Sequence, residues 1–412
     1  MSTACRDPLN PRFVVNFGVQ GCGEEEVQTV NPDFDTIINR QGTWSSKWDK
    51  YREQDVLPMW VADMDFAAPD EVTQALRARL EHPIYGYTVT PDSLIGVIQA
   101  RLRNRYGWSI EPSDLELVPG VVPAINQVIR GVVRPGGAVV TAVPVYQPFL
   151  EAPEYMGRQL FTLEMTEATH WDFPVAEFRA LAAARPEIEL LLLCHPMNPV
   201  GRVMPAAILT EILEICLAHN IVICSDEIHC ELLLDGRVHT PMAAISALAA
   251  DQTITLQAAS KTFNLAGLGC AVVIAQNPEL MAQFKAGGAG IMAHVNTLGY
   301  VATEAAWSEC DAWHESLLRY LAANRDLLVQ HVAEMPGVSV GLTEATFLAW
   351  LNVTELGLID PQGFFESAGV GLSAGAQFRG DGYIRLNFGC PRSVLETGLD
   401  RMRKACDTRM RS

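Results

Sequence analysis

The feature that most limits the fold of this 412-residue chain is a series of short apolar runs separated by helix-length segments. Five such runs, each of five to seven residues, are rich in small and branched apolar residues. Consecutive apolar positions over this length are typical of strands buried on both faces of a parallel sheet covered by helices. We therefore predict an α/β protein with a mostly parallel sheet. The predicted strands are 138–143, 189–194, 221–225, 253–257 and 269–275.

Helical spacing of apolar residues predicts the helices around these strands. After about residue 306 the pattern changes to a long helix, three further strands and a final helix, which suits a smaller α+β lobe. We predict an N-terminal arm over 1–33, a large domain over 69–306, and a small domain made of 34–68 and 307–412. The predicted helices are 70–80, 93–106, 121–133, 205–219, 313–335 and 393–408, and the later strands are 338–342, 346–351 and 383–387.

Charge and composition exclude several classes of function. The net charge of −18 argues against a nucleic-acid or anionic-membrane partner, because phosphate binding needs a basic surface. No apolar run reaches the roughly 18 residues of a membrane span, and the first residues lack the apolar core of a secretory signal. The ten cysteines form no C-x-x-C pair, so we expect reduced thiols, no metal site and a cytoplasmic location.

A lysine follows one predicted strand directly, in the segment 258–264 (AASKTFN). Lysine is most often a solvated surface charge, but Lys261 lies among small and apolar residues between two strands. Burial lowers the pKa of a lysine and favours the neutral amine that can form a Schiff base. Lys261 is thus either an ordinary surface residue or a covalent cofactor anchor.

An aspartate closes another apolar run, in the segment 223–229 (ICSDEIH). Asp226 could cap a helix that begins after it. Alternatively, its carboxylate could pair with a protonated ring nitrogen of a cofactor, since α/β sheets place ligand-binding groups at the carboxyl ends of their strands.

Further candidates follow the same logic. Asn198, in the turn-like segment 195–202 (HPMNPVGR), could donate to an oxyanion, and Tyr146 could stack on a ring or belong to the core. The helix predicted to begin near Val121 offers free backbone N–H groups that can hold a phosphate. Arg385 lies within an apolar run, and arginine is rarely buried without an anion such as a carboxylate.

These motifs, in this order, resemble the pyridoxal-phosphate (PLP) enzymes of the aspartate aminotransferase fold over about residues 35–408. The chain is more narrowly similar to the cystathionine β-lyase and cystalysin branch of C–S lyases. The segments that carry the narrower resemblance are 40–44 (RQGTW), 47–49 (KWD), 60–66 (WVADMDF), 86–87 (GY), 225–229 (SDEIH), 260–264 (SKTFN) and 385–392 (RLNFGCPR).

The resemblance implies a seven-stranded sheet in the large domain, PLP as cofactor, and a homodimer with shared active sites. Lys261 would form the Schiff base and move protons, Asp226 would pair with the pyridine nitrogen, and Asn198 would donate to the cofactor's O3′. Arg385 would hold the carboxylate of an amino-acid substrate, helped by Asn198 and the backbone near Ala62. The remaining implied contacts are Tyr146 and Ile228 on the two ring faces, Val121, Val122 and Ser260 on the phosphate, and Tyr87 on the phosphate of the neighbouring subunit.

The chain departs from this branch at His195, Met197 and Met204, where asparagine, histidine and tryptophan are usual, and it has a longer N-terminal arm. We interpret these departures as signs of a specialised substrate, such as a large cysteine conjugate of secondary metabolism.

The resemblance implies α,β-elimination from a cysteine S-conjugate, which yields a thiol, pyruvate and ammonia. The same cofactor chemistry also allows transamination or an aldehyde-forming decarboxylation with deamination, because only the bond aligned with the cofactor's π system breaks easily. A non-catalytic regulator is a hypothesis of another class. Retention of Lys261, Asp226, Asn198 and Arg385 argues against it, because a pure binding module does not need all four.

Overall fold

The computed structural model of the protein describes residues 32–341 and 343–411. The predicted N-terminal arm therefore lies almost entirely outside the described residues. From Pro32 onward the chain forms one compact unit. The proposed boundaries between a large and a small domain remain a prediction.

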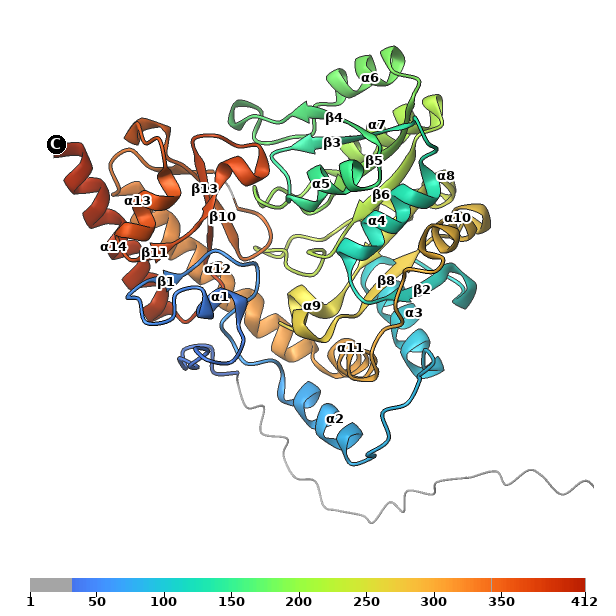
Figure 1. The fold of residues 1–412 in the computed structure, drawn as a ribbon, viewed down its shortest axis with the longest axis horizontal. Helices are drawn as coiled ribbons and strands as arrows, with labels where there is room; N and C mark the ends of the chain where they lie inside the picture. Colours follow the sequence, from blue (N-terminus) through green and yellow to red (C-terminus); the bar gives the residue numbers. More distant parts are fainter. Residues whose placement is uncertain (1–31, 342, 412) are drawn as a thin grey trace, which may run out of the picture. The chain divides into compact units, whose positions relative to one another are not determined.

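Seven strands form one sheet in the order β2-β8-β7-β6-β5-β3-β4 (Figure 1). All neighbours from β7 to β4 are parallel, and only β8 runs antiparallel to its two neighbours. The prediction of an α/β fold with a mostly parallel seven-stranded sheet is confirmed. The strands are β2 (Leu115–Val118), β3 (Ala138–Val143), β4 (Gln159–Glu164), β5 (Ile188–Cys194), β6 (Val222–Asp226), β7 (Thr253–Gln257) and β8 (Ala271–Ile274).

Helices cover both faces of this sheet, and the alternation of side chains along β5 shows how. Leu190 and Leu192 pack with α4, α5 and α10, whereas Leu191 and Leu193 pack with α6, α7 and α8. Both sets are buried, which explains why the strand is apolar at consecutive positions. The six helices are α4 (Val121–Val132), α5 (Pro148–Tyr155), α6 (Val175–Ala184), α7 (Ala206–His219), α8 (Ala247–Gln252) and α10 (Pro278–Gly288).

A smaller antiparallel sheet has the order β12-β13-β10-β9, and β1 pairs with β11 beside it. Its strands are β9 (Ser339–Val340), β10 (Leu348–Asn352), β12 (Ser373–Ala374) and β13 (Tyr383–Asn387), with β1 (Leu57–Pro58) and β11 (Val370–Gly371). The remaining helices are α1 (Ser46–Asp49), α2 (Asp70–Leu80), α3 (Asp92–Tyr106), α9 (Ala259–Thr262), α11 (Thr297–Glu309), α12 (Asp311–Ala333), α13 (Pro361–Ser367) and α14 (Arg392–Arg411).

Two strands of the large sheet were not predicted, β2 and β4. Both carry polar residues that interrupt the apolar pattern, such as Glu116 in β2 and Thr162 in β4. They are the two edge strands of the sheet, so part of each strand faces water and needs no continuous apolar run.

In the part of the chain that the structure describes, no helix is long and apolar enough to span a bilayer.

The register of the sheet brings three strand ends to one edge. Cys194 at the end of β5 pairs with Asp226 at the end of β6, and Asp226 pairs with Leu256 near the end of β7. Residues that follow β5, β6 and β7 therefore begin from neighbouring points at the carboxyl edge of the sheet, where α/β proteins bind their ligands.

Candidate active site

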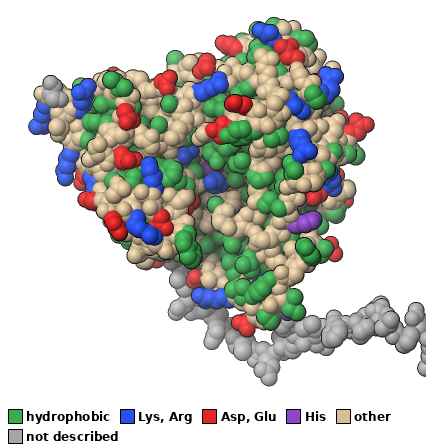
Figure 2. Space-filling model, viewed as in Figure 1, with side chains coloured by type: hydrophobic (Ala, Val, Ile, Leu, Met, Phe, Trp, Pro, Cys, Tyr) green, Lys and Arg blue, Asp and Glu red, His purple; other side chains and the backbone are tan. Residues whose placement is uncertain are grey.

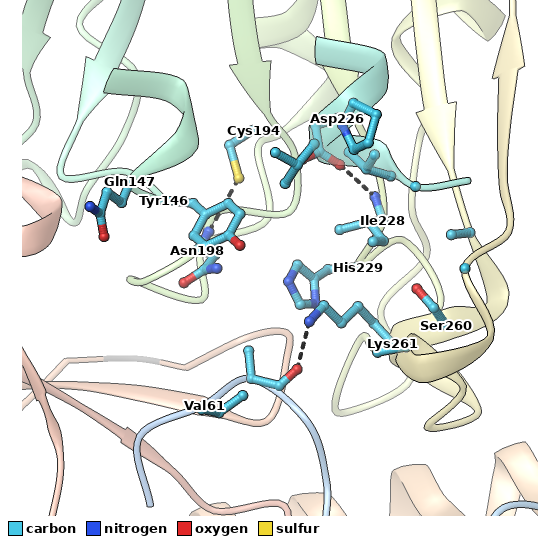
Figure 3. A pocket seen from close by; sticks show the side chains of 18 of the residues that line it. Val61, Tyr146, Gln147, Cys194, Asn198, Asp226, Ile228, His229, Ser260 and Lys261 are labelled. Atoms are coloured by element: carbon cyan, nitrogen blue, oxygen red, sulfur yellow. Dashed lines mark hydrogen bonds between the residues drawn. The ribbon is translucent and has the colours of Figure 1, made fainter. Parts of the chain in front are cut away.

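A cavity of about 490 Å³ lies at this edge of the sheet and is visible as a hollow in the surface (Figure 2). It brings together the residues that the sequence analysis assigned to the site, with the exception of Tyr87. Figure 3 shows several of them facing one space from different elements. The predicted site residues that line the cavity are Ala62, Val121, Val122, Tyr146, Asn198, Asp226, Ile228, Ser260, Lys261 and Arg385.

Lys261 lies in α9, which starts directly after β7, so its side chain leaves the sheet at the carboxyl edge. Its amine donates a hydrogen bond to the carbonyl oxygen of Ala62 at 2.6 Å (Figure 3). Burial, followed by the positive charge of Arg385, lowers the pKa of the amine to about 8. With this pKa, a useful fraction of the amine is neutral near pH 7.5.

Asp226 ends β6, and its buried side chain accepts a hydrogen bond from the backbone N–H of Ile228 at 3.1 Å. No helix begins after it, so the alternative of a helix cap is wrong. Burial raises the pKa of the carboxyl group to about 7, although Lys261 acts in the opposite direction. Within residues 32–341 and 343–411, no lysine, arginine or histidine forms an ion pair with Asp226. A protonated ring nitrogen would supply the missing cation.

Arg385 lies in β13 with only 5% of its surface exposed. It donates to the side-chain oxygen of Asn198 at 2.9 Å and to the carbonyl oxygen of Trp60 at 2.9 Å. Its Nε is buried and has no hydrogen-bond partner among the described residues, and none of their carboxylates pairs with the guanidinium. Burial lowers the pKa of this group to about 10. An arginine in this state is suited to bind a carboxylate from outside the chain.

The contact with Arg385 also orients Asn198. A guanidinium group can only donate, so the amide must turn its oxygen toward Arg385. Its NH₂ group is then free to donate to a ligand in the cavity. The main-chain N–H of Asn198 in turn points to the sulfur of Cys194, 3.4 Å away.

Another part of the cavity wall offers backbone N–H groups. Helix α4 begins at Val121, and the first N–H groups of a helix have no partner within it. The hydroxyl of Ser260 lines the same cavity. Gly269, with a φ of +52°, lies so close to the backbone of Pro119 that an added Cβ would come 2.9 Å from the carbonyl oxygen of Pro119. Free N–H groups at a helix start, a hydroxyl and a glycine-lined wall fit a phosphate group.

Together these groups match the size and the functional groups of PLP. The cavity volume is within the range of cofactor sites. It offers an amine for the aldehyde, a buried carboxylate without a cation for the ring nitrogen, and a helix start for the phosphate. Tyr146 and Ile228 stand on different sides of the cavity, as expected of residues that contact the ring faces (Figure 3). These individual contacts with the cofactor remain predictions.

Tyr87 is the predicted site residue that the structure does not bring to the cavity. Its side chain is fully exposed, at 108%. It was expected to act on the site of a neighbouring subunit, and this remains a prediction.

The sequence did not single out several lining residues. His229 is buried, its Nδ1 has no partner among the described residues, and burial lowers its pKa to about 3. It ends the SDEIH segment, and that position was the only signal for it. The other lining side chains that were missed include Trp60, Val61, Gln147, Cys194, Ser373, Gln377 and Phe378.

The three departures from the branch pattern do not line the cavity. His195, Met197 and Met204 are all buried in the protein core. The ring of His195 packs on that of His239 at 4.5 Å, and His239 bonds to Glu227 at 2.9 Å. These residues therefore alter internal packing rather than the cavity walls, and the specialised substrate that we inferred from them remains a prediction. No group of three or more candidate metal ligands occurs among the described residues.

Comparisons with known proteins agree with this geometry. The family model for class I and II aminotransferases matches residues 54–402. The chain is 37% identical to cystathionine beta-lyase PatB of Bacillus subtilis, over 90% of this chain and 99% of that protein. Its fold matches the crystal structure of OvoB with a TM-score of 0.88 and 41% identity, over 91% of this chain and 99% of that one. It matches PLP-containing cystalysin from Treponema denticola with a TM-score of 0.88 and 31% identity, over 92% and 99%.

The family model covers most of the chain, and the curated relative is matched over nearly its whole length. The chain therefore belongs to the aminotransferase class I and II family, in its branch of cystathionine β-lyases, cystalysin and C–S lyases, and is a PLP-dependent, cystathionine β-lyase-like enzyme.

Proposed function

We propose that the protein cleaves the C–S bond of a cysteine S-conjugate by α,β-elimination, which releases a thiol, pyruvate and ammonia. The observation that carries the proposal is one cavity containing the Lys261 amine, the Asp226 carboxylate and an Arg385 guanidinium without a carboxylate partner in the described chain. Several relatives are named cystathionine β-lyases, and a structural neighbour is named a C–S lyase. Bound PLP supplies an electron sink for the pair of electrons left at the substrate Cα.

The roles of the side chains follow from their chemistry. Arg385 binds the substrate carboxylate and fixes where Cα lies. Lys261 removes the proton from Cα, because its lowered pKa makes it a base near neutral pH. The Cβ–S bond then breaks and sulfur leaves with its electron pair, after which the lysine ammonium can return a proton to the thiolate. Water converts the remaining three-carbon fragment to pyruvate and ammonia.

The walls of the cavity support a conjugate with an uncharged sulfur substituent. Besides Lys261, Asp226 and Arg385, the described lining residues carry no carboxylate, lysine or arginine, and burial keeps His229 neutral at physiological pH. A charged group at the far end of a substrate would therefore find no further charged side chain to pair with among the described lining residues. A role in secondary metabolism remains a prediction, and the departures that suggested it lie outside the cavity wall.

A homodimer is part of the proposal. Residues after α2 expose several large apolar side chains, including Ile84 at 65%, Tyr87 at 108% and Val89 at 83%. Contiguous exposed apolar residues often mark a protein interface. A second copy of the chain over this segment would remove them from water and bring Tyr87 to its neighbour's cavity.

The test uses the purified protein with PLP and an S-alkyl cysteine. We expect a visible absorbance band and release of pyruvate, both abolished in Lys261→Ala. Lys285→Ala is the matched control, because Lys285 is an exposed lysine paired with Glu116 outside the cavity. Amino transfer to a 2-oxo acid without pyruvate would instead indicate an aminotransferase, and aldehyde with CO₂ a decarboxylating enzyme. A protein that stays colourless at saturating PLP would support a non-catalytic regulator.

A further inference from the structure

The segment 60–66 (WVADMDF) lines the cavity with its first three residues and holds two functional side chains through backbone carbonyl groups. The carbonyl oxygen of Trp60 accepts a hydrogen bond from Arg385 at 2.9 Å, and that of Ala62 accepts one from Lys261 at 2.6 Å. Neither carbonyl group could be assigned a role from side-chain chemistry. The position of this segment therefore decides where both side chains are held.

Asn387 forms hydrogen bonds to this segment on both sides of Ala62. Its amide NH₂ donates to the carbonyl oxygens of Val61 at 2.6 Å and of Asp63 at 2.7 Å. Its amide oxygen accepts from the N–H of Gly389 at 2.7 Å, which sets the orientation of the amide group. The side chain is only 1% exposed, so water cannot replace these bonds easily. With the peptide groups before and after it held, the carbonyl group of Ala62 has little freedom to turn away from Lys261.

The rest of the segment is fixed independently of Lys261. Lys47 is buried and bonds to the carbonyl oxygen of Asp63 at 3.1 Å and to the carboxylate of Asp65 at 2.7 Å. Asn264 donates to the carbonyl oxygens of Met64 and Phe66, both at 2.9 Å. These contacts fix the backbone of residues 63–66. The hydrogen bonds of Asn387 likewise fix the peptide groups on both sides of Ala62.

We propose that Asn387 is a positioning residue for Lys261, since it aims the carbonyl group of Ala62 at the lysine amine whenever that amine is not bonded to the cofactor. The inference rests on the proposed function, in which the free amine moves a proton. A lysine side chain has four rotatable bonds, and a fixed acceptor at its end restricts the positions that the amine can occupy. Proton transfer depends steeply on such placement.

The test compares Asn387→Ala with Asn324→Ala. Asn324 is also a buried asparagine whose NH₂ donates to two carbonyl oxygens, those of Phe388 at 3.0 Å and Cys390 at 2.9 Å. Its side-chain hydrogen bonds to described residues do not include residues 60–66. We expect Asn387→Ala to lower kcat by about tenfold or more, with KM changed by less than about threefold, because the lost contact affects proton transfer more than substrate binding. Asn324→Ala should leave kcat within about twofold.

A second measurement does not depend on turnover. In protein stripped of cofactor, the reactivity of the Lys261 amine toward an amine-labelling reagent is followed against pH by mass spectrometry. A hydrogen bond from the ammonium to a carbonyl oxygen favours the protonated form, so its loss lowers the pKa of the amine. The midpoint of labelling should shift to lower pH in Asn387→Ala and stay in place in Asn324→Ala.

An equal loss of kcat in both variants, or an unchanged labelling midpoint in Asn387→Ala, would overturn the inference. If Asn387→Ala does not fold, Asn387→Ser keeps one of the two donors and should give a smaller change of the same kind, and no change in the folded serine variant overturns the inference. Failure of the proposed function appears differently, as a wild-type protein that releases no pyruvate. The labelling experiment still decides the role of Asn387 in that case.

Discussion

Nη1 of Arg385 donates to the side-chain oxygen of Asn198 at 2.9 Å, which joins the residue expected at the substrate carboxylate to the residue expected at the cofactor. The two come from different sheets, since Arg385 lies in β13 and Asn198 follows β5. The contact orients the Asn198 amide and leaves the Nε of Arg385 without a partner in the described chain. Substrate and cofactor are therefore expected to meet at this pair.

Replacement of Arg385 by glutamine should weaken substrate binding strongly. The loss of a buried charged partner costs about 2–5 kcal/mol, so kcat/KM should fall roughly 30-fold or more, mainly through KM. Steady-state kinetics with an S-alkyl cysteine measures this. Arg379→Gln is the matched control, because Arg379 is exposed, bonds to Thr162 and does not line the cavity. Equal kinetics for Arg385→Gln and Arg379→Gln would contradict the assignment.

Cofactor uptake should depend on pH through Lys261. The amine must be unprotonated to bond to the aldehyde of PLP, and its pKa is lowered from 10.5 to about 8. The rate of uptake by cofactor-free protein should therefore rise with pH and reach half its maximum near pH 8. Arg385→Gln removes a positive charge that contributes to the lowered pKa, so the midpoint should move to higher pH. Stopped-flow absorbance measures both, and a midpoint near 10.5 in the wild type would refute the expectation.

Mixed dimers should test whether Tyr87 acts across a subunit interface. If Tyr87 acts in the neighbouring site, Tyr87→Phe impairs the site of the partner subunit. Lys261→Ala instead inactivates the site of its own subunit. Refolding the two variants together should then create some dimers with one intact site and restore part of the activity. Each variant refolded alone is the control. Sedimentation at equilibrium should show a dimer, and a monomer with full activity would rule out a shared site.

Glu227 should matter for stability rather than for chemistry. Its buried carboxylate accepts bonds from Ser225 at 2.8 Å, His239 at 2.9 Å, the N–H of Met242 at 2.9 Å and Gln257 at 3.3 Å, and it does not line the cavity. Replacement of one carboxylate oxygen by an NH₂ group leaves buried donors without an acceptor, which costs about 1–3 kcal/mol, so Glu227→Gln should lower the free energy of unfolding by roughly this amount or more.

Chemical denaturation measures this change. Glu334→Gln is the control, since Glu334 is 70% exposed and its pair with Arg403 should contribute about 1 kcal/mol or less. A Glu227→Gln protein as stable as Glu334→Gln would show that this internal network is not needed for folding.

The core of the site could be predicted because its residues follow the strands. Asn198, Asp226 and Lys261 come after or at the end of β5, β6 and β7, and the carboxyl ends of neighbouring parallel strands always meet at one edge. Continuous apolar runs identified these buried strands, whereas the edge strands β2 and β4 gave a weaker pattern because they face water on one side. Arg385 could be predicted because a charge within an apolar run needs a partner.

The sequence alone therefore determined the fold class, the cofactor and the side chains that meet at the sheet edge. Only the tertiary structure decided which backbone groups serve the site, as the bond from Arg385 to Trp60 spans 325 positions of the chain. It also showed that His195 packs against His239 inside the protein rather than in the cavity. Periodicity and local motifs report which residues are buried, but contacts between distant segments depend on how both sheets pack together, and no local pattern records that packing.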